Sequence, residues 1–154
     1  MPHAHLDVSV TINAPARVVF DRMNDLSSFD DWNPFPEMDP TATTQHSGAE
    51  SGLGAVFEYE GQRLGKGRME IVSVDEPRQV EVALTFWRGE KVTGRGTSLF
   101  VVAENPDGTV DAHWTMDQDR GVGMHLMGTL MFDRMMSGTF VKGLEKLKKL
   151  VETD

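Results

Sequence analysis

The stretch from residue 129 to 151 constrains the fold of this chain more than any other part of the sequence. Its apolar residues recur at every third or fourth position, which is typical of an amphipathic α-helix of about six turns. These residues are Phe132, Met136, Phe140, Leu144, Leu147 and Val151. A helix with one apolar face has to bury that face against another layer of structure.

The residues from about 36 to 117 predict that this second layer is a β-sheet. Apolar and polar residues alternate in several short runs separated by turn signals at hairpin spacing. In the run 79–87, for example, Val80, Val82 and Leu84 alternate with polar or small residues. We therefore expect meander hairpins that form one antiparallel sheet with one apolar face.

The N-terminal part adds one strand and short helices. Residues 6–12 alternate like a half-buried strand, and a short amphipathic helix follows, with Asn13 as its expected cap and Pro15 in its first turn. The stretch "SSFDDWNPF", residues 27–35, is compatible with one more helical turn, which Asn33 and Pro34 would end. Together these elements predict an α+β fold: a curved antiparallel sheet around one long C-terminal helix, with two short helices after the first strand.

Size and composition exclude several classes of protein. The 154 residues fit a single domain, 1–154, with a core from about 6 to 152. The absence of cysteine excludes disulfides and thiolate metal sites, and fits a cytoplasmic protein. No secretory signal is visible, and the longest apolar run, 99–103, is far too short to span a membrane. The net charge of −9 argues against a nucleic-acid partner.

Several stretches resemble landmarks of a known superfamily in the same order along the chain. They are "INAPARVVFDRMND", "WNPF", "SGLGAVFEYEG", "GKGRMEIVSVDEP", "GTVDAHWTM" and "MMSGTFVKGLEKLKKLVE". Together they resemble small bacterial proteins of the polyketide cyclase/dehydrase type, in the helix-grip (START/Bet v 1-like, SRPBCC) superfamily. The resemblance implies a hydrophobic ligand cavity between sheet and helix, of the kind found in lipid-transfer proteins. It implies no catalytic residues, because such a fold carries many functions.

We expect the cavity to be lined by apolar and aromatic residues that the strand and helix patterns place on the inner face. The candidates are Trp32, Phe35, Phe57, Tyr59, Met69, Leu84, Phe86, Trp114, Met116 and Met136. Trp32 has two interpretations: an aromatic gate at the lip of the cavity, which we favour because Asn33 and Pro34 make its loop rigid, or a plug in the core. Tyr59 is the expected polar contact, because its hydroxyl can orient a ligand.

Other motifs point away from metal, cofactor and phosphate chemistry. The five histidines fit no metal-ligand spacing, and His113 should face away from the apolar side of its strand. No phosphate-binding loop or nucleophile elbow is present, so we expect no cofactor and no metal. Glycines at 61, 65, 67, 94 and 96 predict bulges in the strands, and each bulge would reverse which side chains face inward. Gly121, Gly123 and Gly128 are candidates for a mobile flap before the long helix.

Three functions follow as hypotheses. The first is binding of a small hydrophobic or amphipathic molecule in the internal cavity. The second is a cyclase or dehydratase, which would need an inward-facing acid or base beside Tyr59. The third is an interaction module of the co-chaperone kind, for which a collapsed cavity would be evidence. The ligand, the reaction and the oligomeric state are left open by the sequence.

Overall fold

A computed structural model describes residues 3–119 and 126–152, and the side chains of 5–117 and 134–152. The strands of the described chain form one antiparallel sheet in the order β1-β7-β6-β5-β4-β3-β2. The first strand therefore pairs with the last, and the other strands form a continuous meander, as predicted. The strands are β1 (His3–Ile12), β2 (Thr43–Gly48), β3 (Ala55–Gly61), β4 (Gly65–Asp75), β5 (Gln79–Arg88), β6 (Lys91–Glu104) and β7 (Val110–Asp119).

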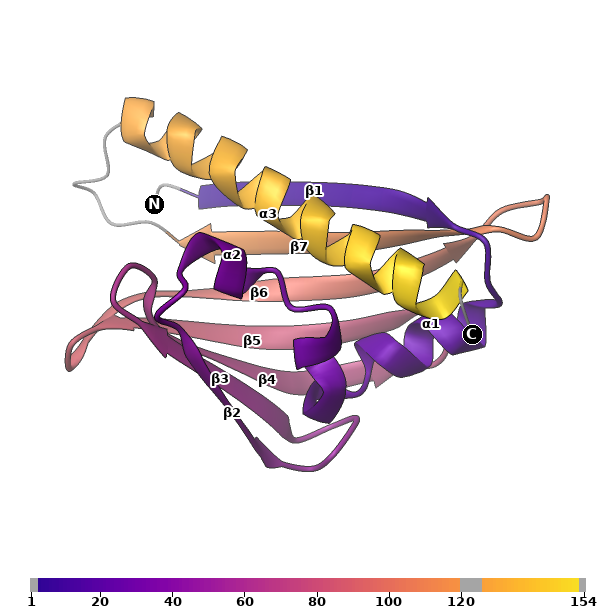
Figure 1. The fold of residues 1–154 in the computed structure, drawn as a ribbon, viewed down its shortest axis with the longest axis horizontal. Coiled ribbons are helices and arrows are strands. Elements are labelled where there is room, and N and C mark those ends of the chain that lie inside the picture. Colours follow the sequence, from indigo (N-terminus) through magenta and orange to yellow (C-terminus); the bar gives the residue numbers. More distant parts are fainter. Residues whose placement is uncertain (1–2, 120–125, 153–154) are drawn as a thin grey trace.

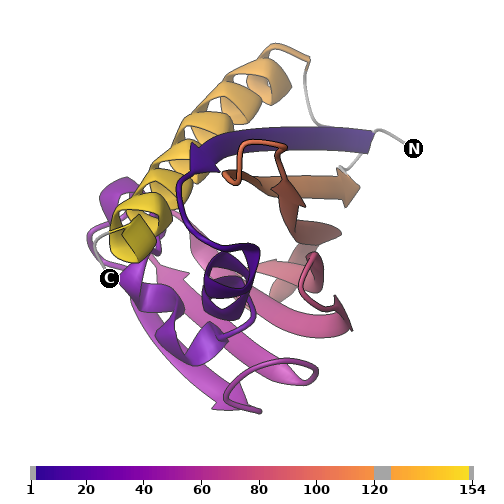
Figure 2. The same ribbon diagram turned by 90° about the vertical axis from the view of Figure 1, so that its right-hand side faces the viewer.

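The helices cover one side of this sheet. The long helix α3 (Leu126–Glu152) runs obliquely across the sheet, and α1 (Ala16–Met23), the 3₁₀ helix η1 (Leu26–Asp31) and α2 (Phe35–Met38) lie on the same side (Figure 1). Seen from the end, the sheet curves toward the helices (Figure 2). The predicted α+β fold is confirmed, and the predicted helix 129–151 is one continuous helix that begins three residues earlier.

Period-two alternation places apolar side chains on the inner face of the sheet, as in β5, where Val80, Val82 and Leu84 are buried. The register shifts between Ile71 and Ser73 and between Phe86 and Trp87. The predicted bulges therefore occur, although they do not coincide with most of the glycines that suggested them.

Helix α3 packs closely against the sheet at Gly143. A Cβ atom on this residue would lie 2.9 Å from Cζ3 of Trp114 and 3.1 Å from Cγ of Pro34. Leu144 and Leu147, on the same side of the helix, are completely buried. The missing side chain of Gly143 thus allows close packing of α3 against β7 and the segment before α2.

The start of α1 differs from the prediction. Asn13 is not its cap: Pro15 occupies the N-cap position in an extended conformation, and no side chain caps the helix. The Pro15 carbonyl accepts the first hydrogen bonds, from the N–H groups of Val18 (3.0 Å) and Val19 (3.3 Å). The N–H of Asn13 instead donates to the Glu152 carboxylate at 2.7 Å, which links β1 to the end of α3.

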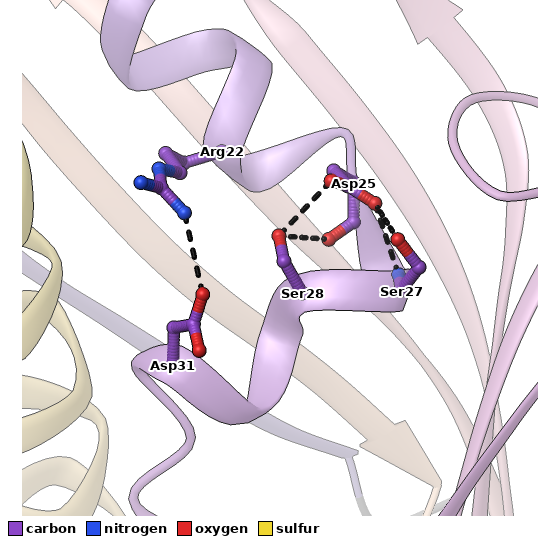
Figure 3. A network of polar contacts seen from close by, with 5 residues as sticks. All are labelled: Arg22, Asp25, Ser27, Ser28 and Asp31. Atoms are coloured by element: carbon purple, nitrogen blue, oxygen red, sulfur yellow. Dashed lines mark hydrogen bonds and ion pairs between the residues drawn. The ribbon is translucent and has the colours of Figure 1, made fainter.

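The next helix, η1, begins at a carboxylate cap (Figure 3). Asp25 accepts hydrogen bonds from the N–H of Ser27 at 3.1 Å and from the hydroxyls of Ser27 and Ser28. Arg22 of α1 pairs with Asp31 at 3.3 Å and so ties α1 to the end of η1. This network sets the direction of the chain toward the "WNPF" stretch.

Asn33 and Pro34 separate two short helices rather than leading into a loop. The side-chain oxygen of Asn33 accepts the N–H of Phe35 at 2.9 Å, and Pro34 is the N-cap of α2. Lys146 of α3 donates to the Asn33 carbonyl at 3.1 Å and pairs with Glu37 at 2.5 Å. The stretch is therefore fixed to α3 by polar contacts as well as by packing.

Within the described residues, no helix combines the length and the hydropathy needed to cross a bilayer.

Candidate ligand-binding pocket

Two adjoining hollows lie between the sheet, α2 and α3, and five residues line both of them. The inner pocket has a volume of about 20 Å³, roughly the space of one water molecule. The mouth pocket measures about 160 Å³. The shared residues are Phe35, Tyr59, Phe86, Met116 and Met136; the inner pocket adds Arg68, Met69, Leu84, Ser98, Trp114 and Phe140, and the mouth pocket adds Leu64 and Thr93.

Most of the residues predicted from the sequence meet at these hollows. Eight of the ten candidates line the inner pocket, and the two that do not are Trp32 and Phe57. The sequence predicted that Phe140 lies on the apolar face of the C-terminal helix. Because Met136, one turn earlier, was a candidate for the cavity, Phe140 could have been added to the candidates on the same basis. Ser98 could have been found from the alternation of its strand, because Phe100 and Val102, which share its face, are buried.

The favoured interpretation of Trp32 as a gate is wrong. Its side chain is 0% exposed and lies edge-on to Phe29 (4.7 Å between ring centroids), Phe100 (5.3 Å) and Trp114 (5.7 Å). Its indole N–H has no hydrogen-bond partner among the described residues. Trp32 is a core plug that secures the end of η1 to the sheet, and of the aromatic residues in this stretch Phe35 is the one at the pocket.

Phe57 also lies apart from the pocket. It is 1% exposed and packs edge-on against Phe29 at 4.9 Å. The prediction that Phe57, Trp114 and Met136 line one shared space is therefore wrong for Phe57. The inner face of the curved sheet is long enough for η1 to cover Phe57 while α2 and α3 lie over the pocket.

Two of the polar residues in the lining already have hydrogen-bond partners in the protein. The Ser98 hydroxyl donates to the Thr115 carbonyl and accepts the indole N–H of Trp114 at 3.0 Å. The guanidinium of Arg68 pairs with Glu70 at 2.8 Å, and its side chain is 38% exposed.

Tyr59 is different. It is 7% exposed, and no hydrogen bond joins its hydroxyl to any of the described residues. Its ring packs against Phe35 at 5.1 Å and covers Gly67, where a Cβ atom would lie 2.3 Å from Cζ of the ring. Burial raises the pKa of the Tyr59 phenol, because the charged form would lose its hydration. The pocket thus contains a neutral hydroxyl that is free to donate.

The described linings of both pockets contain no Asp, Glu or His. His113 points away from the interior, as predicted, and its Nδ1 lies 3.0 Å from the Asp7 carboxylate on the other face of the sheet. Among the described lining residues Tyr59 could act as an acid, and its raised pKa disfavours the role of base.

A buried carboxylate positions one edge of the mouth pocket. Asp39 accepts the backbone N–H groups of Arg63 (2.8 Å) and Leu64 (3.0 Å) on one oxygen, and the N–H (3.0 Å) and hydroxyl (2.5 Å) of Thr41 on the other. These hydrogen bonds, led by that of the Thr41 hydroxyl, lower the pKa of Asp39 to about 2. The hairpin between β3 and β4, which carries Leu64, is thereby tied to the residues after α2.

The predicted flap of glycines lies largely outside the described residues. This applies to Gly121 and Gly123, whereas Gly128 belongs to α3. The flap remains a prediction.

The fold, a curved antiparallel sheet that packs around one long C-terminal helix, defines a helix-grip protein, as the sequence resemblance implied. Residues 3–152 match the family described as polyketide cyclase / dehydrase and lipid transport, and the chain belongs to this family. A search among curated proteins gave no match.

Solved structures show the same fold at low sequence identity. An uncharacterized protein from Rhizobium leguminosarum is 16% identical, with a TM-score of 0.69 over 99% of this chain and 97% of that one. Truncated norcoclaurine synthase from Thalictrum flavum is 9% identical, with a TM-score of 0.69 over 97% and 94%. Ara h 8.0201 is 12% identical, with a TM-score of 0.62 over 99% and 100%.

Proposed function

We propose that this protein binds a small, mainly apolar molecule in the two pockets between the sheet and α3. The observation that carries the proposal is the chemistry of the lining, which is apolar or aromatic apart from Tyr59, Ser98, Arg68 and Thr93. An apolar hollow with few polar groups is typical of small-molecule sites. The family description, which includes lipid transport, supports the same ligand class.

The volumes indicate the size of the ligand. A dry apolar cavity of about 150 Å³ admits benzene, so the mouth pocket matches a group of about one six-membered ring. A larger ligand requires the inner pocket to widen. Met69, Met116 and Met136 suit such a change, because the unbranched side chain of methionine adapts readily to different shapes.

A second candidate is an interaction module that works through its outer surface. The small inner pocket, about 20 Å³, favours it, because such a protein needs no interior space. A cyclase or dehydratase is less well supported, since the described linings contain no carboxylate or imidazole.

Native mass spectrometry of freshly purified protein, followed by titration with the neutral fluorescent probe N-phenyl-1-naphthylamine, tests the first candidate. Thr93→Trp places an indole at the mouth pocket from an exposed position and should weaken probe binding at least tenfold. Val92→Trp adds the same group at an exposed neighbour that lines neither pocket, and should leave binding unchanged. Equal effects of the two substitutions would locate the probe elsewhere. Absence of both a co-purified molecule and saturable binding would favour the interaction module.

A further inference from the structure

We infer that the ligand carries a neutral hydrogen-bond acceptor, a carbonyl or ether oxygen, that receives the hydroxyl proton of Tyr59. The inference rests on the proposed function and specifies the ligand class for the same pockets. Its basis is Tyr59, a buried residue that lines both pockets and whose hydroxyl makes no hydrogen bond with the described residues. A ligand that fills the pockets would cut this hydroxyl off from water, and leaving the donor unpaired would be unfavourable, so a ligand with an acceptor atom there would be preferred.

The position of this hydroxyl is fixed before a ligand arrives. The Tyr59 ring is held between Phe35, 5.1 Å away, and the backbone of Gly67. A Cβ atom at position 67 would lie 2.5 Å from the hydroxyl oxygen, so the ring occupies space that only glycine leaves free. A donor held in one place loses little conformational entropy when it pairs.

The rest of the lining favours a neutral acceptor over a carboxylate. Arg68 is the one cationic residue in the described linings, and its guanidinium is paired with Glu70 and partly exposed. A carboxylate entering the pocket would lose its hydration and would have to share its one described counter-charge with Glu70. The Ser98 hydroxyl already donates to a backbone carbonyl, so it does not compete with Tyr59 as a donor.

Three compounds that each contain a single benzene ring test this inference. Acetophenone offers a ketone oxygen, α-methylstyrene replaces that oxygen by a methylene group of similar shape, and benzoate offers a carboxylate. Dissociation constants from NMR titration of the protein amides should show acetophenone binding about three to ten times more tightly than α-methylstyrene, the ratio expected for one neutral hydrogen bond. Benzoate should bind more weakly than acetophenone.

Two matched variants assign the preference to one hydroxyl. Tyr59→Phe should abolish the preference for acetophenone while α-methylstyrene binds as before. Thr93→Val removes another hydroxyl at the mouth pocket, from an exposed residue, and should preserve the preference. Tyr59→Phe should also melt no lower than the original protein, because it removes no hydrogen bond between described residues.

The outcomes separate the inference from the proposed function. Equal binding of the two neutral compounds, a preference that survives in Tyr59→Phe, or tighter binding of benzoate would overturn the inference and leave the pocket as a binding site. If none of the three compounds binds, the inference and the proposed function both fail for ligands of this size.

Discussion

Two glycines in α3 allow the close packing of helix and sheet to be tested with the same substitution. Gly143 is buried against Trp114 and Pro34, whereas Gly138 is exposed and a Cβ atom there would meet nothing within 4 Å. Replacing glycine by alanine inside a helix gains about 1 kcal/mol from backbone entropy and helix propensity. We therefore expect Gly138→Ala to raise the free energy of unfolding by about 1 kcal/mol.

At Gly143 the same gain is opposed by steric overlap. The new methyl group would lie 2.9 Å from the Trp114 ring, which is stacked on Phe140 at 4.0 Å and bonded through its N–H to Ser98. The ring is held on both sides, so α3 itself has to move. Overpacking a core costs about 1–3 kcal/mol. The free energy of unfolding of Gly143→Ala should therefore lie between that of the original protein and a value about 2 kcal/mol lower. This is about 1–3 kcal/mol below the free energy of unfolding expected for Gly138→Ala.

Urea unfolding of the two variants, followed by circular dichroism, measures this difference directly if the denaturant slopes agree. Equal stabilisation by both substitutions would show that α3 does not approach the sheet at Gly143 as described. Destabilisation by both would show that helix propensity does not govern position 138.

Two further predictions concern the core and the mouth pocket. Asp39 has a pKa of about 2 in the folded protein, below its ordinary value of 3.8, so its contribution to stability should be complete above about pH 4 and should be lost as the pH falls toward 2. The Asp39→Asn variant should have a lower free energy of unfolding than the original protein at pH 7, and should lose less of it between about pH 4 and pH 2. Urea unfolding at several pH values measures both effects. An equal loss in the variant and in the original protein would contradict the lowered pKa of Asp39. Trp114→Phe should cost about 0.5–1.5 kcal/mol more than Trp32→Phe, because it also removes a hydrogen bond to Ser98 while the Trp32 N–H has no described partner; equal costs in thermal or urea unfolding would argue against that bond.

The sequence alone determined most of the elements and their order, because their signals are local, whereas the short helix α2 (Phe35–Met38) was not predicted. Alternation of apolar residues marks a strand wherever one face is buried, and a repeat of three to four marks a helix. Residues 79–87 and 129–151 were predicted on this basis, and both are regular elements in the structure. The same alternation placed Tyr59 on the inner face of its strand, where it is buried.

The tertiary structure decided which inner-face residues border a pocket. Phe57 and Tyr59 are two positions apart on one face of β3, yet η1 covers the first and α2 lies beside the second. Trp32 was predicted to be a gate because Asn33 and Pro34 make its loop rigid. A rigid loop, however, does not show whether the Trp32 ring points into the core or toward the pocket. The size of the pocket and the unpaired state of the Tyr59 hydroxyl depend on how closely α3 and the curved sheet approach each other, and that distance is set by contacts such as Gly143 on Trp114, between residues far apart in the chain.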